Sequence, residues 1–142
     1  MAAKEGYPQA PPLTHDVFAE TWLHHATAVV VARREGVVAG AYYLKPNQPG
    51  LGSHVANAAF MVLPLARGLG LGRRMGEHCL AEARRLGFLS MQFNFVVATN
   101  EGAVRLWKQL GFTIVGTLPQ VFRHPTRGRV DAYVMFRHLG DA

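Results

Sequence analysis

The residues best suited to bind a charged ligand form the segment Arg67-Gly68-Leu69-Gly70-Leu71-Gly72-Arg73. The segment follows an apolar run that closes at Pro64 and precedes a stretch with helical spacing. Glycines let the backbone turn tightly and approach a ligand closely. Free N–H groups at a helix start attract anions, and two arginines add positive charge. The segment therefore predicts a pyrophosphate site.

Three kinds of ligand compete for such a glycine loop. A nucleotide-binding P-loop needs Lys and then Ser or Thr after its last glycine, and here Arg73 and Arg74 follow. A dinucleotide site needs G-x-G-x-x-G and an acidic residue about 20 positions later. The spacing here is G-x-G-x-G, and no Asp or Glu occurs between Glu82 and Glu101. Coenzyme A remains, because the loop follows a V-x-P strand end, Val62-Leu63-Pro64.

Two motifs in the same order resemble the GCN5-related N-acetyltransferase (GNAT) superfamily. The first runs from Val62-Leu63-Pro64 through the glycine loop and resembles its pyrophosphate motif. The second, Asn100 to Phe112, resembles N-x-x-A-x-x-L-[YW]-x-x-x-G-F. The resemblance covers about Ala28 to Leu139 and implies acetyl-CoA as the co-substrate.

The resemblance also implies which residues hold the co-substrate. Backbone groups of Met61, Val62 and Leu63 would pair with the pantetheine arm like an added strand. N–H groups from Gly68 to Arg73 would hold the pyrophosphate. Asn100 would bind near the thiol end, and it is also suited to cap a helix.

For the acceptor, a finer resemblance points to two asparagines. The stretches His54 to Phe60 and Gln92 to Val97 resemble the subgroup that acetylates proline analogues such as azetidine-2-carboxylate. In that subgroup, asparagines matching Asn57 and Asn94 contribute to substrate binding and catalysis. Asn is disfavoured inside strands, and a buried amide needs a hydrogen-bond partner. A structural bond to neighbouring backbone is the alternative role for both.

The acetyl transfer needs a base, and an amide cannot serve as one. A histidine side chain can act as a base, so His54 is the candidate base. Strand alternation places His54 and Asn57 on opposite faces, but family members commonly carry a bulge on this strand that would alter this. Trp107 stands where many members have a tyrosine acid, so water is expected to protonate the leaving thiolate.

Hydrophobic patterning predicts a mixed α/β (α+β) sheet of about six strands, mostly antiparallel, with flanking helices. A turn at Arg33 to Gly36 joins the first two strands as a hairpin, and a basic loop at Arg123 to Arg129 separates the last two. The strands are expected at Ala28–Ala32, Val37–Leu44, Val55–Val62, Ser90–Val97, Phe112–Leu118 and Val130–Arg137, and the helices at Thr14–His25, Gly70–Leu86 and Asn100–Leu110.

The chain of 142 residues is expected to form a single N-acetyltransferase domain, with residues 1–13 as an irregular lead-in. Family members usually begin with a strand and a helix before the segment matching Thr14 to His25. We therefore expect the first strand of the family to be missing.

Composition indicates the class of protein and the compartment in which it works. The 49% hydrophobic content favours a folded core, and no apolar run approaches the roughly 20 residues that cross a membrane. Cys79 is the one cysteine and falls on an apolar helix stripe, which favours core packing and a reducing cytoplasm. The seven histidines show no metal-ligand spacing, so no metal is expected.

The sequence thus predicts an acetyl-CoA-dependent N-acetyltransferase acting on a small amine, such as an amino acid or a proline analogue. The rivals are an acyl-CoA-binding protein that has lost catalysis and a protein or peptide N-acetyltransferase. The net charge of +6 permits a nucleic-acid-binding module, but no such motif is present, so no nucleic-acid partner is expected. No membrane partner is expected either, and a homodimer is compatible with the sequence.

Overall fold

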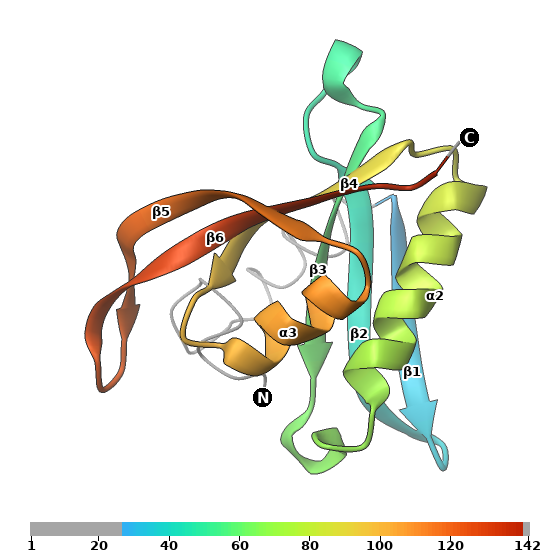
Figure 1. Cartoon of the computed structure of the whole chain (residues 1–142). Coiled ribbons are helices and arrows are strands. Elements are labelled where there is room, and N and C mark those ends of the chain that lie inside the picture. The colour runs from blue at the N-terminus through green and yellow to red at the C-terminus, as the bar shows by residue number, and fades with distance from the viewer. Residues whose placement is uncertain (1–26, 141–142) are drawn as a thin grey trace.

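The computed structural model of the protein describes residues 27–140, which form a sheet with helices packed on one of its faces (Figure 1). The predicted helix at Thr14–His25 and the lead-in lie outside the described residues. Within them the strands are β1 (Ala28–Arg34), β2 (Val37–Pro46), β3 (Val55–Val62), β4 (Ser90–Val97), β5 (Thr113–His124) and β6 (Gly128–His138). The helices are α2 (Leu71–Arg85) and α3 (Glu101–Gln109), with 3₁₀ turns η3 (Gly50–Gly52) and η4 (Pro64–Ala66).

The six strands of the described part lie in the order β1-β2-β3-β4-β6-β5. Only β3 and β4 are parallel, and α2 is the crossover that joins them. The other four pairs are antiparallel. The predicted mixed, mostly antiparallel fold is confirmed, and the predicted bounds of β3 and β4 coincide with the observed ones.

The β5–β6 hairpin is longer than its sequence predicts, and the expected basic loop over Arg123–Arg129 is wrong. The strands continue to His124 and resume at Gly128. An irregularity between Leu118 and Phe122 interrupts the register, and there the Gln120 N–H donates to Asp131 Oδ1 at 2.9 Å. Beyond the irregularity, pairing resumes at Phe122, which is buried. The sequence of this irregularity therefore looks like the end of a strand, although the strand continues.

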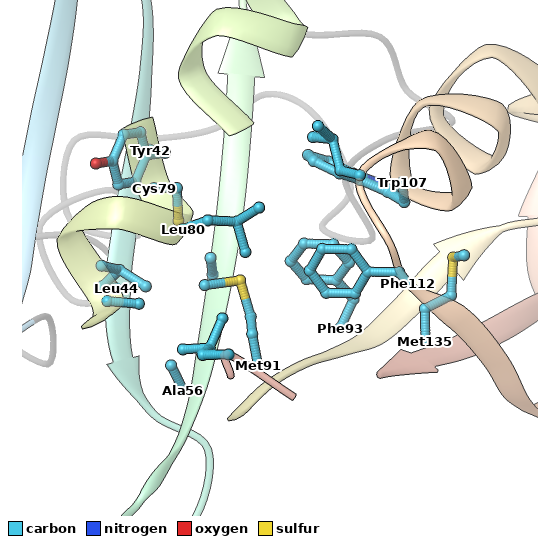
Figure 2. Close-up of a cluster of buried hydrophobic side chains, with 14 of the residues drawn as sticks. Tyr42, Leu44, Ala56, Cys79, Leu80, Met91, Phe93, Trp107, Phe112 and Met135 are labelled. Carbon is cyan, nitrogen blue, oxygen red and sulfur yellow. The ribbon is translucent and has the colours of Figure 1, made fainter. Parts of the chain in front are cut away.

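One hydrophobic core cluster lies under both helices, as Figure 2 shows. Tyr42, Leu44 and Met91 of the sheet lie with Cys79 and Leu80 of α2, and Phe93, Phe112 and Met135 lie with Trp107 of α3. Cys79 is fully buried and free, and its burial raises the pKa of its thiol. The prediction that Cys79 serves packing is confirmed.

Two glycines hold α2 close to its neighbours. A Cβ on Gly40 of β2 would lie 2.7 Å from the Met61 carbonyl oxygen and 3.1 Å from Met75 of α2. A Cβ on Gly76 of α2 would lie 2.7 Å from Leu110 and 3.1 Å from Trp107. Contacts this short leave no room for a side chain, so α2 is fixed against both β2 and α3.

No helix of the described residues is long and apolar enough to cross a membrane.

Candidate active site

The glycine loop is shaped by backbone conformations that favour glycine. Gly68 has φ +77° and Gly70 has φ +75°, both left-handed. Gly70 precedes α2 as its N-cap and supplies no side-chain acceptor, and the first turn contains no acidic residue. The first helical hydrogen bond runs from the Arg74 N–H to the Gly70 oxygen, at 3.2 Å. The N–H groups at the start of α2 therefore point into open space, as an anion site requires.

The space around the loop is also open. A Cβ built on Gly68 or Gly70 would meet no atom within 4 Å. Arg73 stands beside the loop on α2, with Nε 3.6 Å from Glu77 Oε2 and Nη1 donating to Gln109 Oε1 of α3 at 3.2 Å. Arg67 is exposed at the other end of the loop. The loop thus combines unobstructed N–H groups with two exposed guanidinium groups.

Beside the loop, the parallel strands β3 and β4 separate. They pair only at Val55↔Ser90 and Ala56↔Met91, although each strand is eight residues long. Over the remainder of β3, up to the glycine loop, the two strands diverge (Figure 1), and this separation of their backbones is called the opening below. Such an opening offers unpaired backbone groups to an extended ligand.

Alternation along β3 identifies the backbone groups that face this opening. The Leu63 N–H donates to the Ala39 oxygen of β2 at 2.9 Å, and Asn47 N–H of the β2 side donates to the Val55 oxygen. In an antiparallel pair the intervening residues point the other way. Val62, with Phe60 and Ala58, therefore faces the opening. Backbone groups of Met61 and Leu63, which the sequence assigns to the pantetheine arm, point toward β2 instead.

Asn57 lies where the two strands separate. It is buried, with 8% of its surface exposed, and its Nδ2 donates to the Gln92 carbonyl oxygen at 3.0 Å. From the register, the next rung of a continued parallel ladder would join the Ala58 N–H to that same oxygen. The Asn57 amide thus satisfies the Gln92 carbonyl and leaves the Ala58 N–H facing the opening.

Asn94 belongs to a chain of amides on β4. Its Nδ2 donates to Asn47 Oδ1 at 2.6 Å, and its Oδ1 accepts from Gln92 Nε2 at 2.8 Å. A bulge between Phe93 and Val96 displaces this part of β4 from β6. The sequence assigns no role to Asn47 or Gln92. The two-residue spacing of Gln92 and Asn94, which puts both on one face, is the signal that could have identified Gln92.

These amides lie on the sheet face opposite the helices. Gly40 of β2 faces α2, so its alternate neighbours Ala41, Tyr43 and Lys45 face the other way. Lys45 pairs with Asn57, which places Asn57 on the same side. The diverging strands β3 and β4 therefore have the glycine loop on the helix side of the sheet and the amides on the opposite, polar face.

His54 is not brought to this polar cluster. It is exposed in the turn before β3, and its carbonyl oxygen accepts from the Leu89 N–H at 2.9 Å. Between the described residues, no hydrogen bond joins its ring to Asn57 or Asn94. The register of β3 with β2 is continuous, so the bulge expected on this strand is absent there and occurs on β4 instead.

At the start of α3, Asn100 is the N-cap, and its Oδ1 accepts from the Ala103 N–H at 3.3 Å. Trp107 is buried among aromatic rings, with its ring centroid 4.6 Å from that of Phe93 and 4.9 Å from that of Phe60. The position that is a tyrosine acid in many relatives is thus a core residue here. No group of three His, Cys, Asp or Glu residues in the described ranges could hold a metal ion.

Residues 2–112 match the acetyltransferase (GNAT) family. The chain belongs to this family. The relationship is visible at both ends of the site, because the matched range includes the separating strands, the glycine loop and the Asn100 cap. Among curated proteins, the chain is 44% identical over 101 residues to N-acetyltransferase aca1 of Schizosaccharomyces pombe, covering 70% of this chain and 48% of aca1.

Other relatives of this GNAT domain extend the comparison. Protein SPT10 of Saccharomyces cerevisiae is 36% identical over 81 residues, which are 57% of this chain and 13% of SPT10. The chain thus spans about half of aca1 and a small part of SPT10.

Solved structures agree with the fold. A GCN5-related N-acetyltransferase from Kribbella flavida has 42% identity and a TM-score of 0.87, covering 95% of this chain and 84% of its own. The yncA protein of Salmonella typhimurium, solved with its cofactor acetyl-CoA, has 30% identity and a TM-score of 0.72, covering 80% of this chain and 65% of its own.

Proposed function

We propose that this GNAT domain transfers the acetyl group of acetyl-CoA to a primary or secondary amine of a small molecule. One observation carries the proposal. Two parallel strands separate after two paired residues, directly beside a helix whose N-terminus is opened by left-handed glycines. This arrangement offers an anion site and an extended slot in series, which fits the pyrophosphate and pantetheine of coenzyme A.

On the donor side, N–H groups from Gly68 to Arg73 would hold the pyrophosphate, with Arg67 and Arg73 as counter-charges. The pantetheine amides would pair with backbone groups of Val62 and Phe60, which face the opening. The thioester would then lie near Ala58, whose N–H is freed by the Asn57–Gln92 bond. That N–H is suited to stabilise the oxyanion, and Asn100 would border the thiol end.

In the reaction, the amine nitrogen attacks the thioester carbonyl carbon and the C–S bond breaks, while the amine proton passes through water to the leaving thiolate, so that coenzyme A departs as a thiol. Asn57 and Asn94 would position the acceptor or that water, because amides donate and accept hydrogen bonds but do not titrate. We give His54 no part in this mechanism, because it is exposed before β3.

We further propose that the acceptor is a small molecule and that the reaction takes place in the cytoplasm. The names of aca1 and of the Kribbella flavida protein specify N-acetyl transfer without an acceptor, so the small-molecule assignment rests on the amide cluster. The free thiol of Cys79 is compatible with a reducing compartment.

The test is an acetyl-CoA consumption assay over amino acids, proline analogues, polyamines, aminoglycosides and peptides, with coenzyme A affinity measured by calorimetry. Turnover of a small amine supports the proposal. Preferential turnover of peptides would assign the domain to protein or peptide acetylation. Coenzyme A binding without turnover would identify a binding protein that has lost catalysis, and absence of binding would reject the donor site.

A further inference from the structure

Lys45 is a cation on the acceptor side of the sheet. It lies on β2 directly opposite Asn57 of β3, and the two side chains share the face away from the helices. Directly opposite residues of neighbouring strands have Cβ atoms about 5 Å apart. Asn47, which holds Asn94, follows Lys45 by two residues. The ammonium group therefore belongs to the same small area as the amide cluster.

Lys45 has no carboxylate partner in the described part of the chain. Its Nζ lies over the Tyr43 ring, 5.6 Å from the centroid, and this ring contact supplies no counter-charge. The described carboxylates all lie on other elements. They are Glu35 of the β1–β2 turn, Glu77 and Glu82 of α2, Glu101 of α3, and Asp131 of β6, which accepts from the Gln120 N–H.

Near the amide cluster, the described residues thus supply amide side chains and the Lys45 ammonium, while the described carboxylates lie on other elements. Such a surface repels a polycationic acceptor and attracts an anionic one. The amides remain available for the neutral amine, which must reach the thioester unprotonated. The positive charge of Lys45 would therefore attract a part of the acceptor other than the reacting nitrogen.

We propose that Lys45 binds a carboxylate on the acceptor, so that the preferred substrates are amines with a carboxylate a few atoms from the amino group. This inference rests on the function proposed above and specifies its substrate class. Lys45 acts as a specificity residue: its ammonium donates to the carboxylate, while Asn57 and Asn94 lie toward the amine.

The experiment uses matched pairs of acceptors that differ only in the carboxylate: azetidine-2-carboxylate with azetidine, proline with pyrrolidine, and proline with prolinamide. The enzyme is compared with Lys45→Met, which retains most of the aliphatic stem, and with Lys45→Arg, which retains the charge. Arg34→Met, which removes an exposed cation of β1, is the matched control. The readouts are kcat/KM for each amine and the thermal shift that each amine causes in the presence of coenzyme A.

The unaltered protein and Arg34→Met should prefer the carboxylate member of each pair. Lys45→Met should lose about 10- to 100-fold in kcat/KM for that member, the range for a hydrogen bond to a charged group, with little change for the neutral amine. Lys45→Arg should recover part of the loss, and coenzyme A affinity should stay constant in all variants.

Equal turnover of both members, or an unchanged preference in Lys45→Met, overturns the role of Lys45 and leaves the proposed function intact. Absence of turnover, with a carboxylate-dependent thermal shift that Lys45→Met abolishes, supports the Lys45 site and rejects the proposed function. Absence of both turnover and shift rejects both.

Discussion

The proposed donor and acceptor sides of the separated strands consist of different chemical groups. The donor side consists of backbone: left-handed glycines, N–H groups at the start of α2, and the unpaired edge of β3. The acceptor side consists of side chains from separate places in the sequence, namely Asn47 after β2, Asn57 on β3, and Gln92 and Asn94 on β4.

This difference explains why one side can be assigned more closely than the other. A backbone site depends on local conformation, so a short run of glycines specifies it wherever it occurs. A side-chain site depends on the register of strands that are distant in sequence, and a single substitution changes what it recognises. The following variants test whether the two sides can be disturbed separately.

The largest effect is expected from Gly70→Leu. A side chain there would project where the pyrophosphate is proposed to lie, because a Cβ at Gly70 meets no protein atom within 4 Å. We expect coenzyme A affinity to fall at least about 100-fold, equivalent to about 2.8 kcal/mol. Calorimetry measures the affinity, and circular dichroism should show that the fold is retained.

Gly36→Leu is the matched control for Gly70→Leu. Gly36 lies in the β1–β2 turn with φ +79°, and a Cβ there also meets nothing within 4 Å. Both variants carry the left-handed penalty of about 1–2 kcal/mol, but only Gly70→Leu should lose coenzyme A. Equal affinities in the two variants would show that the loop does not hold the donor.

A smaller effect, confined to the acceptor side, is expected from Asn94→Ala. Asn94 is exposed, and among the described residues it bonds to the amides of Gln92 and Asn47, so stability should hardly change. We expect kcat/KM for the amine to fall about 10- to 100-fold, which is about 1.4–2.8 kcal/mol of transition-state stabilisation. Steady-state kinetics should show this at unchanged coenzyme A affinity, and a parallel loss of donor affinity would contradict the separation of the two sides.

Asn57→Ala should disturb both sides modestly, because Asn57 stands at the junction between them. Removing its amide leaves the buried Gln92 carbonyl without its donor, at a cost of about 1–2 kcal/mol of unfolding free energy. Urea unfolding measures this loss. Asn47→Ala is the comparison, since it removes an amide of the same cluster without touching the strand junction, and equal destabilisation of both variants would argue against the junction role.

The smallest effect is expected from His54→Ala. His54 is exposed in the turn before β3, and substitutions at such positions change free energies by less than about 0.5 kcal/mol, or roughly 2-fold in rate. The measurement is kcat/KM against pH for the best amine. Loss of an ionisation near neutrality would identify His54 as the base and would place the acceptor side nearer the start of β3.

Local patterns predicted most of the described fold. The apolar runs of β3 and β4 and the spacing of α2 are sufficient because each of these elements has a Pro or Gly within three residues of at least one of its ends. The extension of β5 to His124 was not predicted, because Pro119 and Gln120 resemble a strand end and only the burial of Phe122 continues the pairing.

For the candidate site, the sequence predicts roles for the glycine loop and for both asparagines, but it does not predict the hydrogen-bond partners of the asparagines. The Asn57–Gln92 and Asn94–Asn47 bonds depend on where β3 and β4 separate and on the bulge in β4, which no local pattern encodes. The same bulge was expected beside His54, and its actual position decides which polar residues gather.

The brief pairing of β3 and β4 also affects the stability that we expect of the domain when no coenzyme A is bound. Without its donor, the domain presents unpaired strand edges in the middle of its sheet, a feature that promotes aggregation and local unfolding. A ligand that fills this gap stabilises the fold by mass action, by about 2.7 kcal/mol at 100 times its Kd. We therefore expect the lifetime of the protein to follow the supply of acetyl-CoA, so that the donor acts as a folding partner as well as a reactant.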